Sequence, residues 1–207
     1  MRWCILVFAL SVTLHAFAQR ELSVDTTQIN QLLDLGAKDQ WVDAYRCLNY
    51  ADQALKQSQE IDYRKGIARA LNLKGFCYWT FGDNDLAIQA ALEALSISHN
   101  PRIVAESYYI LARGYMDLRE NDKAHESIVK AETLASDGSD WTQLCSIYNL
   151  KGVIFYNARK YDSALFFYNK AYEIGKNKSV DPINLPRIIS NIGEVYGREN
   201  PALAFRY

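Results

Sequence analysis

Residues 72–94 read NLKGFCYWTFGDNDLAIQAALEA, and the same opening tetrapeptide begins residues 149–171, which read NLKGVIFYNARKYDSALFFYNKA. The two segments begin 77 residues apart. In both segments an aromatic residue stands three positions after the glycine, and alanines stand twelve and nineteen positions after it. Self-similarity over tens of residues predicts an array of stacked structural units.

The glycine of this pattern marks further copies along the chain. A small residue recurs at steps of 37, 40 and 41, at Gly75, Ala112, Gly152 and Gly193. The aromatic residue follows each marker, as Tyr78, Tyr115, Phe155 and Tyr196. Alanines seven residues apart follow the first three markers, as the pairs Ala87 and Ala94, Ala124 and Ala131, and Ala164 and Ala171, and an earlier pair is Ala44 and Ala51.

The pattern has a simple physical interpretation. A small marker lets two helices approach closely, and residues three or seven positions apart share one helical face. Each unit is therefore predicted to be a helix hairpin that buries its faces by stacking on its neighbours. Turn and capping signals such as Gly82 and Asn100-Pro101 separate the helices. The helices are expected at 26–36, 40–58, 64–81, 84–98, 101–118, 121–136, 140–158, 161–177, 185–198 and 201–207.

The repeated residues resemble the tetratricopeptide repeat (TPR) family. Unit two matches its pattern at Leu71, Gly75, Tyr78, Ala87 and Ala94; unit three at Tyr108, Leu111, Ala112, Tyr115, Ala124, Ile128 and Ala131; and unit four at Tyr148, Gly152, Phe155, Ala164, Tyr168 and Ala171. The resemblance implies an all-α fold, a right-handed α-solenoid of antiparallel helix hairpins. About five units are expected, roughly at 25–60, 64–99, 101–136, 141–177 and 185–207, the last incomplete. Lys74 and Lys151 depart from the pattern where leucine is usual, and we expect their ammonium groups to reach water.

The first residues have the pattern of a secretory signal peptide. Arg2 precedes an apolar run from Trp3 to Leu14, and small residues at Ala16 and Ala18 suit cleavage before Gln19. The alternative is an uncleaved anchor, although the run is short for a membrane span. The sequence therefore predicts a signal peptide at 1–18, a solenoid at 19–207, and a periplasmic or extracytoplasmic location. Export permits disulfides, and the sequence leaves open whether Cys47 and Cys77, on successive predicted helices, form one.

Composition and motifs argue against several classes of function. The 207 residues carry a net charge of −1, which does not favour binding to nucleic acid. We find no nucleophile elbow, zinc-protease motif or phosphate-binding glycine loop. His99 and His125 have no neighbouring ligand residues in the sequence, so no metal site is predicted. The chain is expected to be non-catalytic, with no cofactor.

The family resemblance implies that the first helix of each hairpin lines a concave groove. Mapping the family's groove positions onto this chain gives Arg69, Asn72, Phe76, Trp79, Tyr109, Arg113, Met116, Asn149, Tyr156 and Arg187. Tryptophan, tyrosine and arginine dominate binding energy at interfaces, and the two asparagines suit hydrogen bonds to the backbone of an extended ligand. The alternative is that these side chains pack between hairpins. The family's carboxylate-gripping groove is disfavoured, because Phe76 and Val153 stand where polar residues are needed.

Two functions follow from these observations. The first is an exported scaffold that binds a protein or peptide partner in the concave groove. The second is the N-terminal periplasmic sensory input region of a longer signal-transduction protein, such as a histidine kinase or a transcriptional regulator. The second is suggested by the apolar residues 202–207, which lack a polar capping helix, and it is compatible with a membrane tether beyond them.

Overall fold

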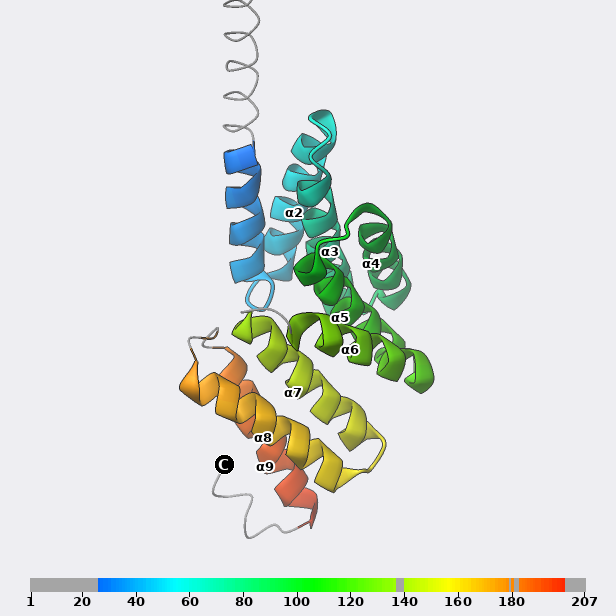
Figure 1. The fold of residues 1–207 in the computed structure, drawn as a ribbon, viewed down its shortest axis with the longest axis vertical. Coiled ribbons are helices and arrows are strands. Elements are labelled where there is room, and N and C mark those ends of the chain that lie inside the picture. The colour runs from blue at the N-terminus through cyan, green and yellow to red at the C-terminus, as the bar shows by residue number, and fades with distance from the viewer. Residues whose placement is uncertain (1–25, 137–139, 179, 181–182, 200–207) are drawn as a thin grey trace, which may run out of the picture.

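A computed structural model describes residues 26–136, 140–178, 180 and 183–199. The predicted signal peptide at 1–18 and the predicted last helix at 201–207 lie outside these residues. Within them the fold is an all-α solenoid of helix hairpins, as the repeat pattern predicts, and no strand occurs in the described ranges (Figure 1).

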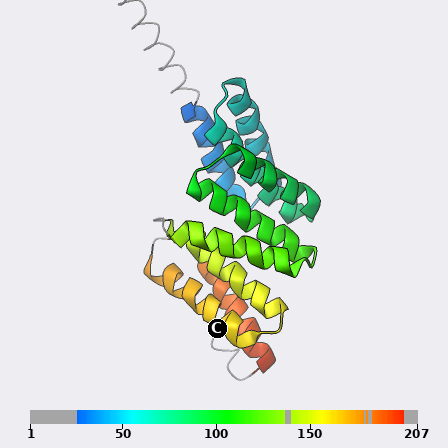
Figure 2. The same ribbon diagram turned by 45° about the vertical axis from the view of Figure 1, so that its right-hand side comes forward.

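The helices alternate between the first and second positions of each hairpin. Residues 26–39 are helical, and eight further helices follow: α2 (Ala44–Glu60), α3 (Arg64–Phe81), α4 (Asn84–Ile97), α5 (Pro101–Asp117), α6 (Asn121–Ser136), α7 (Trp141–Asn157), α8 (Tyr161–Asn177) and α9 (Asn184–Glu199). Figure 2 shows the hairpins stacked in chain order. Most predicted bounds are within two residues of the observed ones, but the helix predicted at 40–58 begins at Ala44, because Asp43 caps it through the Arg46 N–H.

The alanine stripes lie in the interior, as the sequence predicts. Each of the six paired alanines from Ala87 to Ala171 is at most 1% exposed. The small marker at 152 is required by close packing, because a Cβ added to Gly152 would lie 2.4 Å from the ring of Tyr168 on α8. Gly82 ends α3 in the left-handed region at φ 85°, which glycine adopts without strain.

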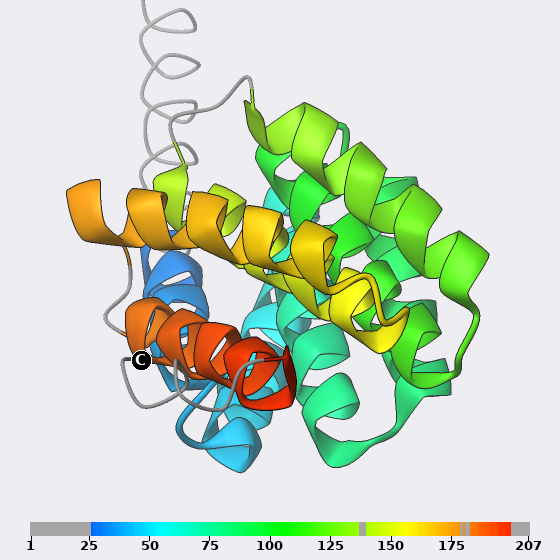
Figure 3. The ribbon, with the colours of Figure 1, turned by 90° about the horizontal axis from the view of Figure 1, so that it is seen from below.

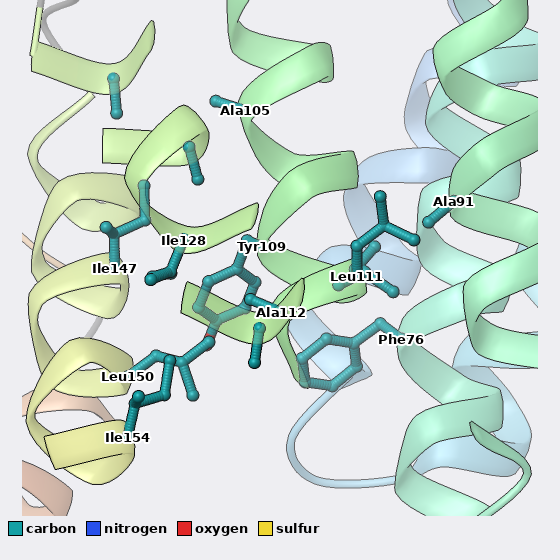
Figure 4. Packing of buried hydrophobic residues seen from close by; sticks show 14 of the residues in the cluster. Phe76, Ala91, Ala105, Tyr109, Leu111, Ala112, Ile128, Ile147, Leu150 and Ile154 are labelled. Atoms are coloured by element: carbon teal, nitrogen blue, oxygen red, sulfur yellow. The ribbon is translucent and has the colours of Figure 1, made fainter. Parts of the chain in front are cut away.

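The core consists of clusters that lie along the stack of hairpins. The largest cluster joins α3 to α7 and includes Phe76, Tyr109, Leu111, Ile147 and Leu150, which Figure 4 shows on both sides of Tyr109. Separate clusters pack the helix at 26–39 against α2 and α3, and α7 and α8 against α9. Each hairpin therefore buries its apolar faces against its neighbours, as stacked repeats require.

The two lysines that depart from the repeat pattern differ in their surroundings. Lys74 Nζ lies 2.6 Å from Asp52 Oδ1 and stays partly exposed. The Lys151 side chain is only 9% exposed; it forms an ion pair with Glu132 on α6 and lies 4.2 Å from the centre of the Phe167 ring. The expectation that Lys151 reaches water is therefore wrong, because α6 and α8 enclose its ammonium group and supply a carboxylate there.

Candidate protein-binding groove

The first helices of the hairpins form one layer of the solenoid. Along this layer α3 packs on α5, α5 on α7, and α7 on α9. Figure 3 shows the helix at 26–39 on the same side of the molecule as α9. We call the surface formed by the helix at 26–39, α3, α5, α7 and α9 the groove.

Two adjoining cavities hollow the groove. One, of about 420 Å³, lies beside Trp41 and is also lined by Phe76 and Tyr109. The other, of about 530 Å³, is lined by Arg69 and the helix at 26–39. Ala37, Arg102 and Glu106 line both cavities. Their sizes fall in the range of ligand-binding pockets, roughly 300–1,000 Å³.

Trp41 lies at the centre of the groove. It belongs to the turn between the helix at 26–39 and α2, and no repeat position marks it in the sequence. Its ring lies 4.7 Å from the Phe76 ring, edge to face, and 6.1 Å from the Trp79 ring. The guanidinium carbons of Arg113 and Arg187 lie 5.1 Å and 4.0 Å from the Trp41 ring. One residue that the sequence analysis missed therefore joins four that it named.

Arg113 is a buried cation enclosed by aromatic rings. It is 6% exposed, and its guanidinium carbon lies 4.1 Å from the centre of the Trp79 ring and 4.8 Å from that of Tyr109. Its Nη2 donates to the Tyr109 hydroxyl at 2.5 Å. Within the described residues no carboxylate forms a salt bridge with Arg113, and its Nε is buried without a hydrogen-bond partner. Cation–π contacts with these rings stabilise the buried charge of Arg113.

The two asparagines predicted to meet a ligand are occupied within the solenoid. Asn72 is fully buried; its amide donates to the Ile103 carbonyl at 3.0 Å and accepts from the Ser107 hydroxyl at 2.7 Å. Asn149 is 2% exposed and accepts from the Asn191 amide at 2.8 Å. These hydrogen bonds join first helices of neighbouring hairpins, so both amides contribute to the packing between hairpins.

The other named residues lie at different places along the groove. Arg69 on α3 donates to Asn30 and Asp34 of the helix at 26–39, at 3.0 Å and 2.8 Å. Met116 is partly buried against the central core. Tyr156 donates to Glu194 on α9 at 2.5 Å, far from Arg69 along the stack. The structure thus brings Phe76, Trp79, Tyr109 and Arg187 together around Trp41 and Arg113, whereas Arg69 and Asn72 lie nearer the start of α3, Met116 near the end of α5, and Asn149 and Tyr156 on α7.

Both acidic and basic groups line the cavities. Burial raises the pKa of the Glu106 carboxyl group. The charges of Arg69 and Arg102 and a 3.5 Å hydrogen bond from Asn72 act in the opposite direction and lower this pKa. Arg102 pairs with Asp140 at 2.8 Å. The groove therefore offers charges of both signs around an aromatic centre, which suits a polypeptide segment better than a simple ion.

The described residues show neither a metal-binding cluster nor a membrane-spanning helix. No group of three or more His, Cys, Asp or Glu side chains in the described ranges is arranged to hold a metal ion. His99 and His125 are both exposed. Of the helices in the described part of the chain, none combines the length and apolar character needed to cross a bilayer.

Known proteins are similar to this chain in its repeats and in its fold. A family model described as "Tetratricopeptide repeat" matches residues 68–100 and 146–177. The solved structure of BtubC (BKLC) from P. vanneervenii is 24% identical, with a TM-score of 0.65 over 87% of this chain and 75% of its own. The apo form of RapI is 19% identical, with a TM-score of 0.63 over 88% of this chain and 53% of its own, so this chain spans about half of RapI. No curated protein sequence matches the chain.

Proposed function

We propose, from the premise that the chain contains tetratricopeptide repeats, that it is a non-catalytic scaffold that binds a protein or peptide segment in the groove. The observation that carries this proposal is the convergence of Trp41, Phe76, Trp79, Arg113 and Arg187 from different hairpins. Phe76 also belongs to the core of the stack, whereas Trp41 lies in a turn outside the repeat pattern and holds Arg113 and Arg187 beside its ring.

The residue types at the centre suit protein recognition. Aromatic and arginine side chains in desolvated surroundings are those that lose the most binding energy when truncated at interfaces. Here they adjoin a cavity whose wall also carries polar groups, among them Thr142 and Gln143. Apolar rings supply affinity in such a site, and the surrounding polar groups set the orientation of a bound chain.

A panel of synthetic peptides of varied composition tests the proposal with the full chain. We expect Trp79→Ala to weaken peptide binding at least tenfold while the variant keeps a cooperative unfolding transition. Phe166→Ala is the matched control, since Phe166 is an aromatic residue on α8 that is 54% exposed. Unchanged binding by folded Trp79→Ala would contradict the assignment of the groove.

The proposal places the protein outside the cytoplasm. Its support is the basic, apolar and small-residue pattern of residues 1–18. A fusion to a reporter enzyme that is active only after export tests this location. We expect activity from a fusion to residues 1–207 and none from a fusion to residues 19–207, and equal activity from both would refute export.

The second candidate function is a periplasmic sensory input region of a longer signalling protein. What supports it is the combination of the export pattern of residues 1–18 with the mostly apolar sequence of residues 202–207. Sequencing the coding region beyond residue 207 tests it. Further repeats, a membrane span and a kinase or DNA-binding segment are expected downstream, and their absence would leave the scaffold as the sole proposal.

A further inference from the structure

The Trp41 indole occupies the part of the groove that is surrounded by Phe76, Trp79, Arg113 and Arg187. We propose that Trp41 is an internal ligand, and that a partner polypeptide binds by placing its own aromatic side chain at this position while Trp41 moves out. The inference rests on the proposed function and deepens it, because it names the chemistry of the partner residue and the group that competes with it.

The Trp41 position is walled by other parts of the chain. Phe76 meets the indole at an interplanar angle of 77°, and Trp79 meets it at 74°, so both present edge-to-face contacts. Arg187 lies 4.0 Å from the ring centre and Arg113 lies 5.1 Å from it. These four walls come from α3, α5 and α9, whereas the indole comes from a turn outside all three helices.

Packing and cation–π contacts hold Trp41 in place without a hydrogen bond from its indole. Among the described residues its indole N–H has no hydrogen-bond partner, and the side chain remains partly exposed. Trp79 differs, because its indole N–H donates to Asp117 at 2.7 Å and thereby fixes the ring as part of the wall. Any aromatic ring of similar size satisfies the contacts that Trp41 makes, so a partner's ring competes with it directly.

The turn that carries Trp41 does not depend on the indole. The N–H groups of Val42 and Asp43 both donate to the Asp39 carbonyl at 2.8 Å. The Asp39 carboxylate accepts from Arg46 at 2.7 Å, and Asp43 caps α2. Rotation about the side-chain bonds of Trp41 therefore takes the ring out of the groove without breaking these hydrogen bonds.

Arg113 selects an aromatic partner over an aliphatic or polar one. Its buried charge has no salt bridge within the described part of the chain, and four rings surround it, of which Trp41 is one. An aliphatic side chain in place of the indole gives Arg113 no π face, whereas a ring restores the fourth contact. The cavity of about 420 Å³ beside the indole gives room for the residues that flank a partner's ring.

The chain itself supplies a probe for this competition. A peptide with the sequence of residues 38–44, KDQWVDA, carries the indole in its native context, and KDQAVDA is its matched control. Fluorescence polarisation of the labelled, end-capped peptides measures binding to the full chain and its variants. We expect Trp41→Ala to bind KDQWVDA at least tenfold more tightly than the wild type, and neither protein to bind KDQAVDA measurably.

Two variants of the same turn control for indirect effects. Trp41→Phe keeps a ring in the groove, so we expect it to bind KDQWVDA as weakly as the wild type. Val42→Ala truncates the neighbouring side chain, which is 70% exposed, and we also expect wild-type binding. A cooperative unfolding transition and unchanged helical circular dichroism confirm that each variant is folded.

Several outcomes would overturn the inference. Equal binding of KDQWVDA by the wild type and Trp41→Ala, or no binding by folded Trp41→Ala, removes the competition. Unfolding of Trp41→Ala makes the indole a structural residue and equally refutes the role of internal ligand. If the peptide panel binds both proteins equally without preference for aromatic residues, the scaffold proposal survives and only this inference fails; if no peptide binds either protein, both fail.

Discussion

Oxidation of the Cys47 and Cys77 pair is expected to stabilise the first two hairpins. Cys47 lies on α2 and Cys77 on α3, both fully buried, and their sulfur atoms are 2.9 Å apart. A disulfide requires about 2.05 Å, so a shift of less than an ångström closes the bond. The sequence left this pairing open, and the structure brings the two thiols into contact.

The size of the effect follows from the separation of 30 residues along the chain. The chain-entropy relation gives about 3.7 kcal/mol for closing a loop of this length in the unfolded state. For a chain of this size, that corresponds to a rise in Tm of about 7–15 °C. The hydrogen bond to Cys47 and burial raise the pKa of the Cys77 thiol, so we expect oxidation to occur during folding more readily than in the native protein.

Refolding with and without a mixture of oxidised and reduced glutathione provides the assay. Mass spectrometry of a protease digest identifies the linkage, and urea unfolding measures the free energy with and without reductant. Cys77→Ala is the control, and its stability is expected to be the same under both conditions. A linkage to Cys145, or an oxidised wild type no more stable than the reduced form, would refute the reasoning.

Three further predictions concern single sites. Burial raises the pKa of Glu106, so the stability contributed by its protonated side chain is fully present below about pH 4.5 and is lost as the pH rises through the pKa of the folded protein. In urea titrations, Glu106→Gln should therefore gain stability relative to the wild type between pH 4 and pH 7. A difference in stability that stays constant over this range would contradict the prediction. Gly152→Ala is expected to lower the free energy of unfolding by about 1 kcal/mol, since crowding against Tyr168 outweighs the gain in helix propensity, and Gly152→Ala/Tyr168→Leu should recover part of that loss. Lys151→Met should lower the free energy of unfolding by roughly 1–3 kcal/mol, because it leaves the Glu132 carboxylate without its ion pair. The double variant Lys151→Met/Glu132→Gln should recover part of this loss. Additive losses in this double-mutant cycle would show that the two side chains are not coupled.

The depth of several candidate groove residues could not be predicted from the sequence. Asn72 and Asn149 fall at positions that line a groove in the family, but the first helices of neighbouring hairpins approach closely enough to bury both amides. Phe76 and Tyr109 are also largely buried, at 4% and 7% exposed, although both line the cavity beside Trp41. Helical periodicity assigns a residue to a face, whereas the depth of that residue depends on how closely the next hairpin packs.

The sequence alone determined the repeat, the hairpins and the buried alanine stripes, because each depends on spacing within one or two helices, where the geometry is local. The place of Trp41 was decided only by the tertiary structure. Its walls come from α3, α5 and α9, and Arg187 is 146 positions away in the chain. Contact between residues so far apart in the chain depends on the rotation of each hairpin relative to the one before it, added over all the hairpins. No local sequence pattern encodes this sum.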